Sequence, residues 1–148
     1  CNRGPVYQFY VPKMSIMPKF NYARYNGTNR PIVPIKLKNS GQEIGYHVLV
    51  DSGADICLFH AEIGEAIGID ITKGEKREVF GVGGKASIYY LHKVTLEVGG
   101  WEYKVEAGFL PTVGTRIVPY GIVGQIGFFE FFKVIFDQQA GEIELKKK

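Results

Sequence analysis

The stretch from Val48 to Asp55 joins an apolar run to residues that could do chemistry, in the order VLVDSGAD. Three β-formers in a row favour a strand that is buried on both faces and ends at Asp51. Burying an ionised carboxylate costs several kcal/mol unless the group is hydrogen-bonded or shares a proton. Asp51 therefore either caps a turn, in which Gly53 would take a positive φ, or belongs to a catalytic site. The stretch alone does not decide between these alternatives.

Segments on both sides of this stretch complete a pattern that resembles the retropepsin-like aspartic proteases. Upstream, residues 30–37 read RPIVPIKL, which is similar to the first strand of a retroviral protease. Downstream, Ile122 and Val123 precede Gly124, as two apolar residues and a glycine do in the second signature of the family. The resemblance covers roughly residues 30–136. Extra segments at both ends make the chain look more like a cellular or bacterial relative than a viral enzyme.

The resemblance implies a role for each residue that follows the apolar run. Asp51 would be the catalytic carboxylate, the Ser52 hydroxyl would hold the equivalent loop of a second chain, and Gly53 would let the backbone curve around the catalytic water. Ala54 and Asp55 would bind the substrate, with the Asp55 carboxylate bonding the substrate backbone and pairing with an arginine. Serine in place of the commoner threonine is a tolerated variant within the family.

The resemblance also assigns supporting residues away from this loop. Arg30 lies where the family places an arginine that reaches across to the acidic residue of the partner subunit. Ile122, Val123 and Gly124 would support the loop near the dimer interface. Many retroviral members continue with an arginine that pairs with the acidic residue, whereas this chain has Gln125. A neutral amide can still hydrogen-bond a carboxylate, but the charge pairing is lost, which would weaken the local structure or the dimer.

Aspartic-protease chemistry needs two carboxylates that are close enough to share one proton. One stays ionised and activates a water, while the other is protonated and polarises the scissile carbonyl. The sequence has one Asp-Ser-Gly, and neither Asp70 nor Asp137 has the flanking signature. The simplest arrangement is a symmetric homodimer that brings two Asp51 side chains together, cuts a peptide or protein substrate and needs no cofactor. The alternative is a retropepsin-fold dimerisation or peptide-binding module with little or no turnover.

A glycine-rich segment is predicted at the tip of a hairpin over residues 76–90, and it comprises Gly81, Val82, Gly83 and Gly84. Glycines make such a tip mobile and let its backbone approach a ligand closely. The spacing argues against a phosphate-binding loop, because Val79 stands where the first glycine should be and Ala86 replaces the serine or threonine. The resemblance identifies the segment as the flap, a lid that closes on extended substrates.

The composition is ordinary for a globular domain of 148 residues, with 45% hydrophobic and 22% charged residues and a net charge of +3. Basic residues are scattered except for Lys146–Lys148, which we interpret as a solvated tail and not a nucleic-acid site. No apolar run approaches the roughly 20 residues that span a bilayer. The three histidines, at positions 47, 60 and 92, and the two cysteines form no metal-binding pattern, so no metal is expected. The sequence does not indicate in which cellular compartment the protein acts.

The rest of the chain reads as short strands and turns, which favours an all-β fold: a closed retropepsin-like barrel with a flap hairpin and one or two short helices. Residues 1–29 would form an extended N-terminal arm with one short strand near residues 6–11, and residues 30–148 the protease domain. Further strands are expected over 32–37, 44–50, 94–98, 102–107, 122–123, 134–136 and 142–145, and short helices over 60–67 and 128–132.

Overall fold

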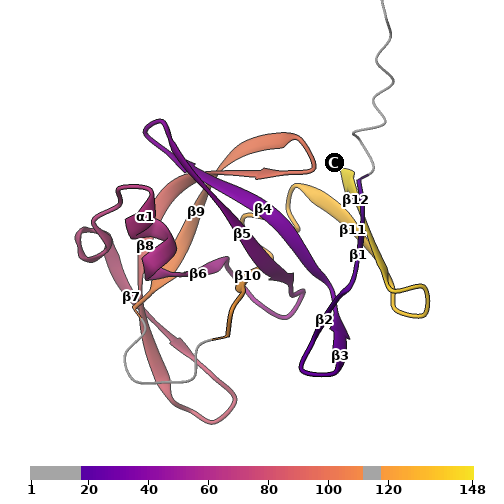
Figure 1. Cartoon of the computed structure of the whole chain (residues 1–148). Coiled ribbons are helices and arrows are strands. Elements are labelled where there is room, and N and C mark those ends of the chain that lie inside the picture. The colour runs from indigo at the N-terminus through magenta and orange to yellow at the C-terminus, as the bar shows by residue number, and fades with distance from the viewer. Residues whose placement is uncertain (1–17, 112–117) are drawn as a thin grey trace, which may run out of the picture.

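The computed structural model describes residues 18–111 and 118–148, and these residues form mainly strands (Figure 1). The all-β class is therefore confirmed. The strand expected near residues 6–11 lies outside the described residues. The elements are β1 (Lys19–Asn21), β2 (Ala23–Tyr25), β3 (Thr28–Arg30), β4 (Ile32–Asn39), β5 (Gln42–Val50), β6 (Leu58–His60), α1 (Ala61–Ala66), the 3-10 helix η2 (Ile71–Lys73), β7 (Glu75–Phe80), β8 (Ala86–Val98), β9 (Trp101–Leu110), β10 (Gly121–Val123), β11 (Phe132–Asp137) and β12 (Glu142–Lys147).

Seven strands form the main sheet in the order β4-β5-β10-β6-β9-β8-β7. β4 also pairs with β8, so the pairings from β4 round to β8 return to their start and give the barrel in Figure 1. This last pairing is short and joins Lys36–Lys38 to residues 95–97. β5 and β10 are parallel neighbours, an arrangement that brings their carboxyl ends to the same edge of the barrel.

Alternating side chains explain why these segments form a half-buried sheet. In β4, Val33, Ile35 and Leu37 alternate with the exposed Pro34 and Lys36, and Ile32 at the start of the strand is also buried. The same alternation in β5, β8 and β9 fills the barrel with branched and aromatic side chains. The largest fully buried side chains include Phe59, Phe109, Phe128, Leu37, Ile67 and Leu96.

Part of the predicted N-terminal arm is sheet. β1 pairs with β12, which pairs with β11, and the three strands lie together beside the barrel (Figure 1). β2 and β3 form a separate hairpin. Phe20 and Tyr22 pack against the core cluster, so this segment contributes to the core of its own chain. Strands of three residues are too short to show a period in the sequence, which is why they were not predicted. The division of the chain at residue 30 stays a prediction.

One of the two expected helices forms. α1 occupies the centre of the predicted 60–67 segment and is followed by Gly68, which has the positive φ of a helix stop. The helix predicted over 128–132 is wrong, because that segment is a series of turns and Phe132 begins β11. Gly127 has a positive φ of 96°, and the amide of Phe129 reaches back to the carbonyl of Gly124. Because of these two features, the backbone before Phe132 forms wide turns and not the first turn of a helix.

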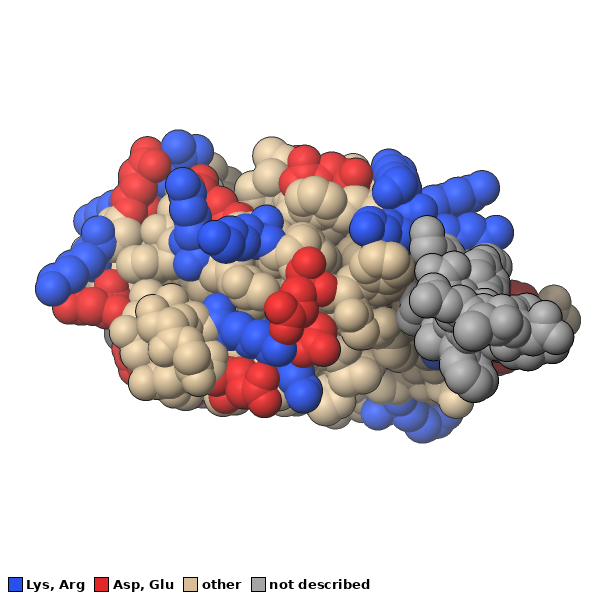
Figure 2. Space-filling view, turned by 90° about the horizontal axis from the view of Figure 1, so that it is seen from above, with Lys and Arg blue, Asp and Glu red and all other residues tan. Residues whose placement is uncertain are grey.

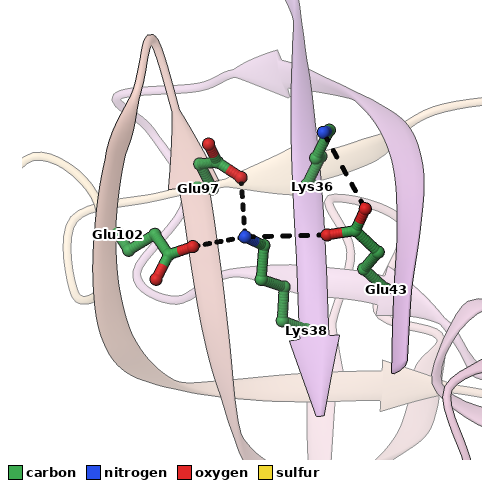
Figure 3. A network of polar contacts seen from close by, with 5 residues as sticks. All are labelled: Lys36, Lys38, Glu43, Glu97 and Glu102. Atoms are coloured by element: carbon green, nitrogen blue, oxygen red, sulfur yellow. Dashed lines mark hydrogen bonds and ion pairs between the residues drawn. The ribbon is translucent and has the colours of Figure 1, made fainter. Parts of the chain in front are cut away.

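An ion-pair cluster lies where β4 and β5 meet the β8–β9 hairpin (Figure 3). The Lys38 ammonium contacts the Glu102 carboxylate and lies 3.0 Å from Glu97 and 3.6 Å from Glu43, and the Lys36 ammonium lies 3.9 Å from Glu43. Hydrogen bonds to Glu102 and then to Glu97 raise the pKa of Lys38 above its usual range. We refer to these five residues as the Lys38 cluster.

Charged side chains of both signs are interspersed over the face of the molecule shown in Figure 2. Within residues 18–111 and 118–148, no helix is long and apolar enough to cross a membrane. The same residues contain no group of three or more potential ligands from His, Cys, Asp and Glu that could hold a metal ion.

Candidate active site

Asp51 lies at the edge of the barrel where two parallel strands end. Val50 is the last residue of β5 and stands opposite Val123, the last residue of β10. The amide of Asp51 donates to the carbonyl of Val123 at 3.0 Å, and the amide of Val50 donates to the carbonyl of Pro31 at 2.9 Å. The backbone at Asp51 is thus fixed by hydrogen bonds on both sides, which limits where its carboxylate can lie.

The loop after Asp51 is a tight turn. The amide of Gly53 donates to Asp51 Oδ1 at 2.9 Å, and the amide of Ala54 donates to the carbonyl of Asp51 at 3.2 Å. Asp51 is half-buried, whereas Ser52 and Gly53 are exposed. The predicted positive φ at Gly53 is wrong: the backbone curves without the left-handed conformation, because the Asp51 side chain closes the turn. The first alternative raised by the sequence is therefore confirmed, since Asp51 caps a turn, while its membership of a catalytic site stays a prediction.

The segment after β10 runs beside this loop and fixes it. The amide of Gln125 donates to the carbonyl of Ala54 at 2.8 Å, and the amide of Ile126 donates to the carbonyl of Asp55 at 2.9 Å. A Cβ on Gly124 would lie 2.5 Å from the carbonyl oxygen of Ala54, closer than such contacts allow. Glycine is therefore required here by the close approach of two backbones.

The side chain of Gln125 has a different partner from the one expected. Its Nε2 donates to the carbonyl oxygen of Ser52 at 2.6 Å, and in the part of the chain that is described it makes no hydrogen bond to the carboxylate of Asp55. Asp55 is exposed. Gln125 thus supports the loop through the backbone and not through the acidic side chain.

The glycine-rich tip lies at the end of the β7–β8 hairpin, which extends away from the barrel in Figure 1 toward the same side as the β2–β3 hairpin. The amide of Gly84 donates to the carbonyl of Gly81 at 2.9 Å, and Gly84 has a φ of 76°. Gly81 and Gly83 have no other atom near the position of a Cβ. Val82 at the tip is fully exposed. The tip has the shape expected of a flap and leaves its apolar side chain free.

Arg30, at the end of β3, is half-buried. Its Nε is shielded from solvent and has no hydrogen-bond partner among the described residues. Arg30 and Asp55 form no ion pair within the chain over those residues. The pairing of Arg30 with the acidic residue of a second subunit stays a prediction.

Two other reactive side chains take structural roles. Cys57 is fully buried, and burial raises the pKa of its thiol to about 11, which makes it a poor nucleophile. The hydroxyl of Tyr46 bonds His60 Nδ1 and accepts a hydrogen bond from the amide of His60 at 3.2 Å.

One residue beside the Asp51 loop was not predicted from the sequence. It is Ile126, whose β-bridge with Ile56 extends the contact between the Asp51 loop and the segment after β10. It lies two residues after Gly124, the end of the second signature, and this proximity was the available signal.

Comparison with solved structures identifies the class of fold. A crystal structure of a retropepsin-like aspartic protease from Rickettsia conorii superposes with a TM-score of 0.63 and 16% sequence identity over 88% of this chain and 92% of that one. The protease of EIAV in complex with the inhibitor HBY-793 gives a TM-score of 0.49 and 22% identity over 70% of this chain and 88% of that one. The match to the Rickettsia conorii structure, with its TM-score of 0.63, shows that the fold is retropepsin-like.

The sequence itself identifies the family. The family model for aspartyl proteases matches residues 33–125, from β4 through the Asp51 loop and the flap hairpin to Gln125. This match covers more than half of the chain, so the protein belongs to the aspartyl protease family. No curated protein matches the sequence.

Proposed function

We propose that the protein is an aspartic endopeptidase that acts as a homodimer, with one Asp51 from each chain. The observation that carries this proposal is the position of Asp51, a half-buried carboxylate at the paired ends of β5 and β10 in a chain of the aspartyl protease family. One Asp-Ser-Gly per chain supplies half of the required pair. A two-fold axis near the loop would supply the other half.

The chemistry follows from two such carboxylates in contact. They share one proton, because like charges at this distance do not both ionise. The ionised carboxylate takes a proton from water as the water oxygen attacks the scissile carbonyl carbon, and the protonated carboxylate donates its proton to the carbonyl oxygen. The carboxyl group that now holds the proton then donates it to the amide nitrogen, while the other carboxylate takes a proton from a hydroxyl of the tetrahedral intermediate. The C–N bond breaks, the amine and the acid leave, and the pair again holds one shared proton.

The local geometry suits this role. Asp51 Oδ1 is held by the amide of Gly53, while Oδ2 makes no hydrogen bond within the described residues and is free for water or for the second carboxylate. Ala54 and Asp55 would bind the substrate backbone, and Gly81–Gly84 would close over it as a flap. Arg30 and the Ile122–Gln125 segment would support the interface between the two chains.

The decisive experiment compares Asp51→Asn with wild-type protein on a mixed peptide library at several acidic pH values. Loss of cleavage with an unchanged circular dichroism spectrum and sedimentation coefficient is expected, because the amide cannot act as a base. Asp70→Asn, at an exposed position outside the loop, is the matched control and should keep full activity. Cleavage retained in the Asp51 variant would remove this residue from the mechanism. A dimer that binds the peptides without cutting them would favour the binding-module alternative.

A further inference from the structure

A single peptide group joins Gln125 to the catalytic carboxylate. The carbonyl of Ser52 accepts from Gln125 Nε2 at 2.6 Å, and the amide of Gly53, the other end of the same peptide group, donates to Asp51 Oδ1 at 2.9 Å. The C–N bond of a peptide is conjugated, so a donor at the oxygen makes the N–H a better donor. The two hydrogen bonds therefore act as one chain from the glutamine amide to the carboxylate.

The glutamine side chain starts from a fixed backbone. The amide of Gln125 donates to the carbonyl of Ala54 at 2.8 Å, and the carbonyl of Gln125 accepts from the amide of Glu130 at 3.1 Å. The preceding Gly124 lies in backbone contact with the 54–56 segment. These contacts place Gln125 one residue past β10 and directly across from the Asp-Ser-Gly turn. The pairing of β10 with β5 and the backbone contacts of Gln125 thus already place its side chain near Ser52. Forming the hydrogen bond to Ser52 costs little further conformational entropy.

We propose that Gln125 is a positioning residue for the catalytic carboxylate, which orients the Ser52–Gly53 peptide group so that the Gly53 amide points at Asp51 Oδ1. The inference rests on the proposed function only in taking Asp51 as the catalytic group. A neutral amide has an advantage here, because it strengthens the donor without placing a positive charge beside a carboxylate that must share a proton.

No charged side chain on the surrounding elements replaces this interaction. Arg30 on β3, Asp55 on the loop and Glu130 after Gln125 make no ion pair or hydrogen bond with Asp51 within the described residues. The charged residues of β4 belong to the Lys38 cluster. In the proposed dimer, the other charged group close to this carboxylate would be Asp51 of the partner subunit. The donor from Gly53 is then the main fixed interaction of the carboxylate, and its quality depends on Gln125.

The test uses Gln125→Met, which keeps the length of the side chain and removes the donor, and Gln125→Arg, which keeps an N–H donor. Gln138→Met, in the turn between β11 and β12, is the matched control. In the folded wild-type protein, two-dimensional NMR follows the Gly53 amide as a function of pH. In Gln125→Met its proton should move upfield, and the pH dependence of its shift should differ from that of the wild type, because a weaker donor stabilises the ionised carboxylate less.

Kinetics provide an independent readout. In Gln125→Met, kcat should fall by about tenfold with KM changed by less than about twofold, because the reacting group loses its orientation while the substrate contacts remain. The acid limb of the pH profile should change together with the NMR titration. Gln125→Arg keeps an N–H donor but adds a positive charge near Asp51, so its kcat should lie between those of Gln125→Met and the wild type. Gln138→Met should leave each of these quantities unchanged.

Two results would overturn the proposal: a Gly53 amide that titrates identically in Gln125→Met and in wild type, or a loss of activity that merely follows a lower Tm. If Gln125→Met does not fold, Gln125→Asn, whose amide is one methylene too short to reach Ser52, takes its place with the same expectations. If the wild-type protein cuts no peptide, the proposed function fails while the NMR titration still decides the role of Gln125.

Discussion

The two ends of β5 are stabilised in opposite ways. At its first residues the strand contributes Glu43 to the Lys38 cluster, where two lysines and three glutamates meet at the surface (Figure 3). At its last residues it leads to Asp51, whose loop is held by backbone amides and the side chain of Gln125. The first end of β5 is thus stabilised by ion pairs, and the end near Asp51 is stabilised by neutral hydrogen-bond donors.

This difference fits the chemistry proposed for Asp51. A cation paired with a carboxylate favours its ionised form, and two catalytic carboxylates that share a proton need one of them to stay protonated. Neutral donors fix the loop without adding such a bias. The Lys38 cluster has no such constraint, so charge can be used freely there. We therefore expect substitutions at the site end of β5 to have large effects and substitutions at the other end to have small ones.

The largest effect is expected at Arg30, the one cation predicted to act at the site end. Its shielded Nε lacks a partner within the described residues, which a carboxylate from a second chain would supply. Removing one member of a buried ion pair costs roughly 3–5 kcal/mol, whereas an exposed pair contributes less than about 1 kcal/mol. Arg30→Ala should weaken the dimer by orders of magnitude in sedimentation equilibrium and make activity per chain depend on concentration.

Arg24→Ala, at an exposed position on β2, is the control and should leave the dimer unchanged. A double-mutant cycle with Asp55→Ala measures the coupling between the two side chains across the interface. A coupling energy near zero, or peptide cleavage by a monomer at every concentration, would contradict the shared site.

The next largest effect is expected for Gly124→Ala. The new methyl group would lie 2.5 Å from the carbonyl of Ala54 and 2.6 Å from that of Ile56, and neither backbone can move without breaking the contact between β10 and the loop. Overpacking of this kind costs about 1–3 kcal/mol. Urea unfolding should show that loss, together with lower activity. Gly45→Ala, on β5 with no atom within 4 Å of the new methyl group, should lose nothing; an equal loss in both variants would contradict the steric explanation.

The sequence allowed the site end of β5 to be predicted in much greater detail than the rest of the molecule. The Asp51 loop, the Ile122–Gly124 signature and the flap tip are local patterns whose residue types limit the backbone strongly. β4 and β5 were recognisable because their alternation continues over many residues. The sequence also shows that residue 125 is a glutamine, but it does not show that the side chain donates to the carbonyl of Ser52.

The errors occurred where distant contacts decide the local structure. β1 forms because Lys19–Asn21 meet β12, more than a hundred residues away in sequence. The 128–132 segment has helix-compatible residues, yet its turns are set by contacts with Gly124 and Gln125. At Gly53 the expected positive φ was unnecessary because Asp51 closes the turn with its side chain. A local pattern contains no information on such partners.

A smaller effect, confined to activity, is expected at the flap. Gly83 has an ordinary φ and open space around its Cβ position, so Gly83→Val should leave Tm within about 2 °C of the wild type. Turnover should fall by about tenfold or more if the tip has to reach conformations that a β-branched residue does not allow. Gly84 is a poorer choice, because its φ of 76° would strain any side chain. Equal losses of activity and stability in Gly83→Val would show that the hairpin is structural and not a lid.

The smallest effect is expected at the other end of β5. Lys38→Met removes the central cation of the Lys38 cluster but keeps most of its apolar stem, and ion pairs near the surface contribute little to stability. Tm at neutral pH should change by no more than about 2 °C, and the difference from wild type should shrink further in 1 M salt because screening shortens the range of the charges. Lys104→Met, at an exposed position on β9, is the control.

The pH dependence of this small difference has a definite sign. The glutamates raise the pKa of Lys38 in the folded protein, so the folded state binds this proton more tightly than the unfolded state does. The contribution of Lys38 is therefore complete below the ordinary lysine pKa of about 10.4 and is lost as the pH rises through the higher folded value. Wild-type and Lys38→Met proteins should thus converge in stability at strongly alkaline pH. The difference should also decrease in acid, where the three carboxylates become protonated. A loss in Lys38→Met as large as that in Gly124→Ala would contradict the contrast between the two ends of β5.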